Sequence, residues 1–385
     1  MRRLVPVVCA ASCLLAAAGE AAAAACPTGV LWPEPDWQEA LLPASSPAVR
    51  AFDDYVFTLV GADADRVGLR TDGVVIVHRG RIIHERYARG YTQTNRHLAW
   101  SVSKSFTNAM VGVAVGRGDL TLDDSICDHY DAAIHCETTV GDMLDWGSGL
   151  DWNEGYENEA YYLSSVIAML YGVGSGDMAA FVAGHPLAHD PGTFYSYSTG
   201  DTVLLSAVLA GALPPDLRES FPWEFVFDPI GMRSAIFEHD RGGTFVGGSY
   251  VYATPRDFAR YGYLFLRDGC WNGARVLPEG WVAESTSPNP TFLSNPTEEW
   301  RQEKDAVPGR HWWLNVELPD LAHESVWPTA PPDTFAALGH WGQTIFVVPS
   351  LDLVIVRVAD DRETGVLDRP KYLDLALAIA AEDGP

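Results

Sequence analysis

Two apolar stretches near opposite ends of the chain have the pattern of β-hairpins. Residues 74–87 read Val-Val-Ile-Val-His-Arg-Gly-Arg-Ile-Ile-His-Glu-Arg-Tyr, and the turn is predicted at Arg79-Gly80. Residues 344–358 form the second apolar run, with its turn at residues 349–352. An Ala- and Leu-rich stretch near residues 371–382 predicts a helix at the end of the chain.

The middle of the chain has a different pattern. It is rich in helix formers and is interrupted by turn sequences such as Gly147-Ser148-Gly149 and Pro191-Gly192. We therefore predict an α+β fold, in which both ends of the chain build one antiparallel sheet flanked by helices. The sheet part would cover about residues 45–118 and 236–385, and a mainly helical region would be inserted at about 119–235.

The first twenty-five residues have the features of a secretory signal. Arg2 and Arg3 precede an apolar, Ala-rich run over residues 4–18, and residues 21–25 are all small. The run is shorter than the roughly 20 residues that a membrane span needs, and no later stretch is long and apolar enough. We expect export to the periplasm or the medium, without stable membrane insertion. Lipid anchoring at Cys26 is a less favoured alternative, because alanine stands three positions before it, where a larger apolar residue is expected.

Composition narrows the range of partners and cofactors. The 385 residues are 47% hydrophobic and 20% charged, which favours a packed core over disorder. The formal net charge of −25 argues against a nucleic-acid partner. The histidines and cysteines lack metal-ligand spacing, so we predict no metal and no cofactor.

Four cysteines remain once Cys9 and Cys13 leave with the signal. An even number of cysteines in an exported chain suggests disulfides. The closely spaced Cys127 and Cys136 form the favoured pair, and Cys26 with Cys270 is a second option.

The candidate chemistry begins at residues 100–106, Trp-Ser-Val-Ser-Lys-Ser-Phe. Apolar residues at helical spacing follow, so a helix is predicted to start here, with Ser101 and Lys104 on one face. A serine hydroxyl needs a base before it can act as a nucleophile, and a neutral lysine can be that base. Ser-x-x-Lys also arises by chance, so the motif needs companions.

Two later segments supply candidate companions. Residues 191–201 read Pro-Gly-Thr-Phe-Tyr-Ser-Tyr-Ser-Thr-Gly-Asp, and Tyr197 within them is either a core aromatic or a phenol that relays a proton. Residues 339–343, Gly-His-Trp-Gly-Gln, lead directly into the second predicted hairpin. That segment is either an ordinary turn or a strand edge that supplies a backbone N–H to an oxyanion.

These three segments, in this order, resemble the serine β-lactamase-like hydrolases. That family includes class C β-lactamases, D-Ala-D-Ala carboxypeptidases, β-lactamase-fold esterases and 6-aminohexanoate-oligomer hydrolases. Residues 143–152 and 248–257 also look like the family, so the resemblance runs from about residue 70 to 360. It implies a β-lactamase/transpeptidase-like fold, with the site between the sheet and the helical region.

The resemblance implies a role for each matching residue. Ser101 would be the acylated nucleophile, and Lys104 and Tyr197 would share the acid and base work. The backbone N–H groups of Ser101 and Gln343 would form the oxyanion hole. The substrate-binding residues would be Trp152, Tyr156, Thr199, His340, Trp341 and Gly342.

Three departures from the β-lactamases narrow this expectation. Thr199 stands where those enzymes have asparagine, His340 where they usually have lysine, and Trp341 where a small hydroxyl residue is usual. A lysine there helps to hold a substrate carboxylate, so penicillin turnover is disfavoured. The sequence looks closest to the esterase and 6-aminohexanoate-oligomer hydrolase branch.

An acidic, aromatic loop at residues 151–159 carries a separate hypothesis. Its carboxylates, among them Glu154 and Glu157, would select uncharged or cationic substrates; the alternative is a solvated loop.

We therefore predict an exported serine hydrolase that cleaves a small carboxylic ester or amide through an acyl-serine intermediate. The alternatives are a D-Ala-D-Ala carboxypeptidase, a β-lactamase, or a non-catalytic penicillin-binding-like sensor. The oligomeric state remains open.

Overall fold

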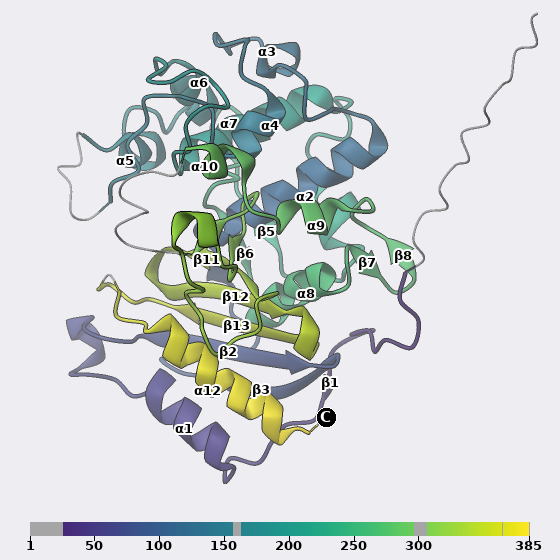
Figure 1. Cartoon of the computed structure of the whole chain (residues 1–385), viewed down its shortest axis with the longest axis vertical. Helices are drawn as coiled ribbons and strands as arrows, with labels where there is room; N and C mark the ends of the chain where they lie inside the picture. Colours follow the sequence, from purple (N-terminus) through teal and green to yellow (C-terminus); the bar gives the residue numbers. More distant parts are fainter. Residues whose placement is uncertain (1–25, 157–162, 296–305, 364, 385) are drawn as a thin grey trace, which may run out of the picture.

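The computed structural model describes residues 26–156, 163–295, 306–363 and 365–384 (Figure 1). The predicted export signal at residues 1–25 lies outside this range, and so does Glu157 of the acidic loop. Within the described ranges, no helix combines the length and the apolar character needed to cross a membrane.

An eight-stranded sheet forms the centre of the described structure, in the order β1-β3-β2-β13-β12-β11-β10-β9. Its strands are β1 (Gln38–Glu39), β2 (Thr71–His78), β3 (Arg81–Tyr87), β9 (Val307–Pro308), β10 (Trp313–Leu314), β11 (Phe335–Gly339), β12 (Gln343–Val348) and β13 (Leu353–Ala359). Neighbouring strands are antiparallel except β1 and β3, which pair in parallel over two residues. The predicted α+β fold, with a sheet built from both ends of the chain, is confirmed, and the short parallel edge strand is an addition to it.

The two predicted hairpins form the middle of this sheet, where β2 pairs with β13. In the first hairpin, His78 pairs with Arg81, so the turn has two residues. These residues, Arg79 and Gly80, have φ of 51° and 76°. Positive φ at both positions characterises the hairpin turn whose twist matches that of the strands.

Helices cover both faces of the sheet, because its central strands are apolar on both sides. Val74 and Ile76 of β2 pack towards α1 (Pro47–Val56) and α12 (Arg369–Glu382), which lie side by side in Figure 1. Val75 and Val77 face the opposite way, into the larger core that includes α8 (Pro255–Leu266). The alternation follows from the two-residue period of a strand.

Helix α2 (Val102–Arg117) connects the sheet to the helical region. It contacts β11 and β12 on one side and α7 (Thr199–Ala212) on the other. Figure 1 shows α3 to α7 grouped at the end of the molecule remote from α1 and α12. The remaining helices are α3 (Ile126–His129), α4 (Val140–Leu144), α5 (Ser165–Tyr171), α6 (Met178–Ala183), α9 (Trp281–Ser285) and α10 (Pro290–Ser294).

Two small sheets lie outside the central sheet. One has the order β4-β6-β5, from β4 (His97–Leu98), β5 (Ile236–Phe237) and β6 (Val251–Ala253). The other pairs β7 (Cys270–Trp271) with β8 (Ala274–Arg275).

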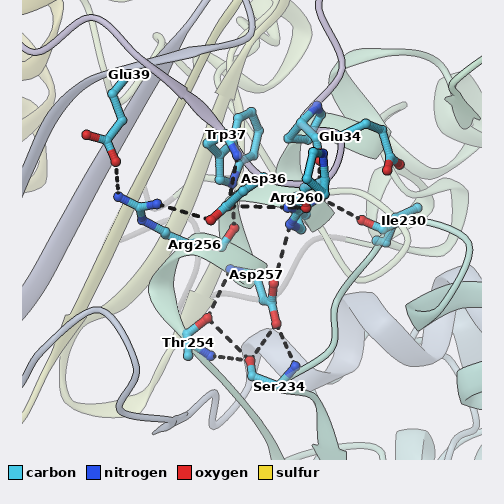
Figure 2. A network of polar contacts seen from close by, with 12 residues as sticks. Glu34, Asp36, Trp37, Glu39, Ile230, Ser234, Thr254, Arg256, Asp257 and Arg260 are labelled. Atoms are coloured by element: carbon cyan, nitrogen blue, oxygen red, sulfur yellow. Dashed lines mark hydrogen bonds and ion pairs between the residues drawn. The ribbon is translucent and has the colours of Figure 1, made fainter.

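A disulfide and a polar network fasten the N-terminal segment to α8 and its neighbours. Cys26 is bonded to Cys270, and Cys127 is bonded to Cys136 within the helical region. Figure 2 shows the network, in which Asp36 lies between Arg256 and Arg260 at the start of α8.

Candidate active site

Ser101 lies where β4 leads into α2. The Ala99 N–H donates to the Val251 carbonyl of β6, which fixes the chain just before the serine. Trp100 then adopts φ of 49°, and Ser101 follows as the N-cap residue of α2. Left-handed backbone in a bulky residue is uncommon, and such strained positions gather at functional sites. The turn places Ser101 at the edge of a cavity.

Lys104 lies one turn into α2 and is 1% exposed. Its Nζ lies 3.0 Å from Ser101 Oγ, 2.8 Å from Thr199 Oγ1 and 3.0 Å from the Gly248 carbonyl oxygen. Burial lowers the pKa of Lys104 to about 8, although the Glu154 carboxylate acts in the opposite direction. At neutral pH, about a tenth of the molecules would therefore carry a neutral amine.

Thr199 and Gly248 reach Lys104 because two backbone segments pack closely. Thr199 is the first residue of α7, whose N-cap is Ser198. A Cβ on Gly248 would lie 2.6 Å from Thr199 Cγ2, so only glycine fits there. This close approach brings the Gly248 carbonyl to the amine.

Tyr197 is held by aromatic packing beside Ser101 and Lys104. Its ring centroid lies 4.7 Å from that of Trp146 and 5.8 Å from that of Trp313, and Lys104 Nζ lies 4.9 Å from its centre. Its hydroxyl interacts with the Ser101 side chain. Burial raises the pKa of Tyr197 well above its usual value, so at neutral pH the group is a phenol that can donate a proton.

A cavity of about 320 Å³ opens beside Ser101. Tyr156, Tyr197 and Trp313 line it, together with the segment from Gly339 to Gln343. The Tyr156 ring stacks on His340 with centroids 4.8 Å apart. The cavity wall therefore includes four of the predicted substrate-binding residues: Tyr156, His340, Trp341 and Gly342.

Backbone constraints bring the His340–Gly342 segment to Ser101. A Cβ on Gly339 would lie 2.5 Å from the Ala99 carbonyl oxygen, so the end of β11 contacts the chain that enters α2. Trp341 has φ of 57°, and its ring centroid lies 5.0 Å from that of Trp100. Two tryptophans in left-handed conformation thus flank the serine.

Gln343 also lines this cavity, and its side chain is committed to the fold. Its amide donates to the carbonyls of His340, Trp341 and Ala359, and its side-chain oxygen accepts the Ala359 N–H. Only the backbone of Gln343 is therefore offered to a bound group, which is the part assigned to the oxyanion hole by resemblance.

Two predicted substrate-binding residues lie elsewhere. Trp152 and Thr199 are not among the residues lining this cavity, and Thr199 is fully buried. Trp152 Nε1 donates to Glu154 Oε2 at 2.7 Å, and the Thr199 hydroxyl donates to Glu154 Oε1. Their polar atoms are directed at a carboxylate behind Lys104, and their contact with substrate stays a prediction.

Glu154 is the functional candidate whose location the sequence did not reveal. It was predicted to lie in a loop that selects substrate charge, but its carboxylate also accepts the Thr199 N–H at 2.9 Å. The signal available in the sequence was a lone acidic residue between two aromatics, Trp152 and Tyr156. That pattern does not indicate which helix the carboxylate meets.

Two further residues of the site were not singled out in the sequence. Trp313 of β10 lines the cavity beside Tyr197. His311 is buried, and its Nδ1 bonds the Lys104 carbonyl oxygen at 2.9 Å. Burial lowers the pKa of His311 to about 3, so it supports the first turn of α2 as a neutral ring.

Within the described ranges, no group of three or more His, Cys, Asp or Glu side chains is arranged to hold a metal ion.

Comparison with known proteins places this arrangement in a family. The chain is 24% identical over 336 residues to a 6-aminohexanoate-dimer hydrolase of Paenarthrobacter ureafaciens, covering 81% of this chain and 79% of that one. A solved family VIII carboxylesterase superposes with a TM-score of 0.63 at 15% identity, covering 90% of this chain and 99% of that one. A penicillin-binding protein from Bacillus halodurans superposes with a TM-score of 0.59 at 14% identity, covering 81% and 97%. The Beta-lactamase family model matches residues 54–379, and the chain belongs to that family.

Proposed function

We propose that this protein is an exported serine hydrolase that cleaves small carboxylic esters or amides through an acyl-serine at Ser101. The single observation that carries the proposal is the position of Lys104 Nζ, buried and 3.0 Å from Ser101 Oγ. Burial lowers the pKa of this amine to about 8, which makes its neutral form accessible near neutral pH.

In the acylation step, Ser101 Oγ attacks the substrate carbonyl carbon while its proton passes to Lys104 Nζ. The carbonyl oxygen becomes an oxyanion, and the backbone N–H groups of Ser101 and Gln343 are proposed to stabilise it. The tetrahedral intermediate collapses as the bond to the alcohol or amine breaks. Tyr197, beside Ser101 and Lys104, donates the proton that the leaving group requires and is reprotonated from Lys104.

Deacylation repeats these transfers with water. A water molecule attacks the acyl carbon and gives its proton to the neutral Lys104 amine, and the new oxyanion occupies the same N–H groups. Collapse breaks the bond to Ser101 Oγ, which recovers a proton from Lys104 or Tyr197, and the carboxylic acid leaves.

The wall of the cavity favours esters and linear amides over β-lactams. His340 stands where β-lactamases usually carry a lysine, and its ring is stacked on Tyr156 and packed edge-on against Trp100. At His340 and Trp341 the wall is aromatic and lacks the lysine that would hold a substrate carboxylate there, although Arg362 and Arg369 also line the cavity. The relatives named as a 6-aminohexanoate-dimer hydrolase and a carboxylesterase support the same choice.

The test is a burst experiment with the mature chain and p-nitrophenyl butyrate. We expect a stoichiometric release of nitrophenol, together with an intact mass increased by one butyryl group. The Ser101→Ala variant should show neither. A wild-type protein that gives no burst and no adduct with this ester or with a linear amide dimer would favour a non-catalytic sensor.

A further inference from the structure

Glu154 occupies an unusual position relative to the site. Its carboxylate lies at the N-terminus of α7, where it accepts the Thr199 N–H at 2.9 Å and the Trp152 indole N–H at 2.7 Å on Oε2. Its other oxygen accepts the hydroxyls of Thr199 and Tyr156. Four donors at a helix N-terminus are the surroundings of an ionised carboxylate.

An ionised Glu154 determines the direction of the next hydrogen bond. A hydroxyl has one proton, and Thr199 gives that proton to Glu154, so its oxygen can only accept from Lys104. The Gly248 carbonyl can also only accept. Two N–H bonds of Lys104 are therefore committed, one to each of these acceptors.

These two hydrogen bonds fix the orientation of the Lys104 amine when it is neutral. An uncharged amine has two protons and one lone pair, and both protons are already directed at Thr199 and Gly248. The lone pair must then face the third neighbour, Ser101 Oγ, at 3.0 Å. That is the orientation in which the amine can accept the serine proton.

We propose that Glu154 is a positioning residue that, through the Thr199 hydroxyl, directs the lone pair of Lys104 at Ser101. This inference rests on the proposed function. Glu154 does not itself line the cavity beside Ser101, although it accepts the hydroxyl of the wall residue Tyr156. Its influence on Lys104 passes through Thr199 and through its field.

The test is Glu154→Gln, measured by kcat, KM and a pH profile. A glutamine amide donates to Thr199 Oγ1, so the threonine proton turns to the Lys104 lone pair and competes with Ser101. We expect kcat to fall about 100-fold, with KM changed less than threefold. Because Glu154 raises the pKa of Lys104, the acid limb should also move below the wild-type midpoint near pH 8. A residue with a purely structural role would lower kcat and the melting temperature without moving this limb.

Thr199 variants provide the second arm of the test. Thr199→Ser keeps the hydroxyl and should retain activity within about fivefold, whereas Thr199→Val should lose activity to the same extent as Glu154→Gln. The double variant Glu154→Gln/Thr199→Val should be no worse than the poorer single variant, because both changes remove one relay. Glu219→Gln, at an exposed glutamate, is the matched control for a change of charge.

The outcomes separate this inference from the proposed function. If Ser101→Ala remains active, the proposed function fails whatever Glu154 does. If Ser101→Ala is inactive but Glu154→Gln keeps the wild-type kcat and pH midpoint, the positioning role is overturned. Strictly additive losses in the double variant would also overturn it. Should Glu154→Gln fold poorly, the comparison of Thr199→Val with Thr199→Ser decides, and equal activities of these two would contradict the relay.

Discussion

The active-site cluster and the network at the start of α8 each hold a cation, and the two cations have different partners. In the network of Figure 2, Arg256 donates to both oxygens of Glu85, which is not drawn, and to Glu39, and these partners raise the pKa of Arg256. At the site, Lys104 donates only to neutral oxygens, and burial lowers its pKa to about 8.

This difference explains why Lys104 can act as a base whereas Arg256 stays charged. Arg256 touches carboxylates directly, so its charge is stabilised and it contributes to holding the N-terminal segment. Lys104 has its nearest carboxylate one residue further away, behind Thr199, so its ammonium form is destabilised by about 3 kcal/mol relative to water. The protein thereby holds an amine that is ready to take a proton.

The largest expected effect comes from removing the nucleophile. Ser101→Ala should reduce kcat by about 10⁵-fold, because no other group at this position can form the acyl-enzyme. The melting temperature should change by less than about 3 °C. Turnover and thermal unfolding measured on one preparation would check both, and retained esterase activity would remove Ser101 from the mechanism.

Tyr197→Phe should reduce kcat by about 10³-fold, because it removes one proton donor and leaves the ring in place. The packing against Trp146 and Trp313 does not need the hydroxyl, so circular dichroism and unfolding should match the wild type. A fully active variant would show that Lys104 alone moves the protons.

Asp201, two residues after Thr199, extends the comparison to stability. It is 1% exposed, and burial raises its pKa to about 7. In the unfolded chain the Asp201 carboxyl loses its proton near pH 4. In the folded state it keeps this proton up to about pH 7. The associated stability is present at low pH and is lost as the pH rises through 7, by about 3 kcal/mol between pH 4 and 7.

Asp201→Asn should abolish that slope. Urea unfolding of both proteins at pH 4 to 7 gives the difference curve, in which other groups such as His311 cancel. Parallel curves would place the titration elsewhere.

At the α8 network we expect a substitution to lower stability and to leave kcat nearly unchanged, unlike the active-site variants. Arg256→Met should lower the free energy of unfolding by about 2 kcal/mol, because Glu85 keeps its buried charge without its cation. The kcat of the folded enzyme should stay within twofold. A large loss of kcat without loss of stability would show that the two clusters are coupled.

Local patterns in the sequence were enough to predict much of the fold. The hairpins at 74–87 and 344–358 and the helix near 371–382 correspond to β2–β3, β12–β13 and α12, because each is defined by neighbours in the chain. The short strands β1, β9 and β10 were not predicted, since two residues carry too little periodicity.

The site shows the same division between local and distant contacts. Ser101 and Lys104 were placed on one face because they are three positions apart at the start of a helix, and the family resemblance added Tyr197. Glu154 could not be placed, because its role depends on meeting Thr199, 45 residues away. The same reason explains why the hydrogen bond from the Trp152 indole to this carboxylate was not predicted.

The most direct test of the central claim is the pH dependence of acylation, measured as the rate of the nitrophenol burst from pH 6 to 10. The account predicts a rate that rises about tenfold per pH unit at low pH and levels off with a midpoint near pH 8, as the Lys104 ammonium loses its proton. A burst rate that is flat over this range, or that keeps rising past pH 10, would contradict a buried, neutral Lys104 as the base.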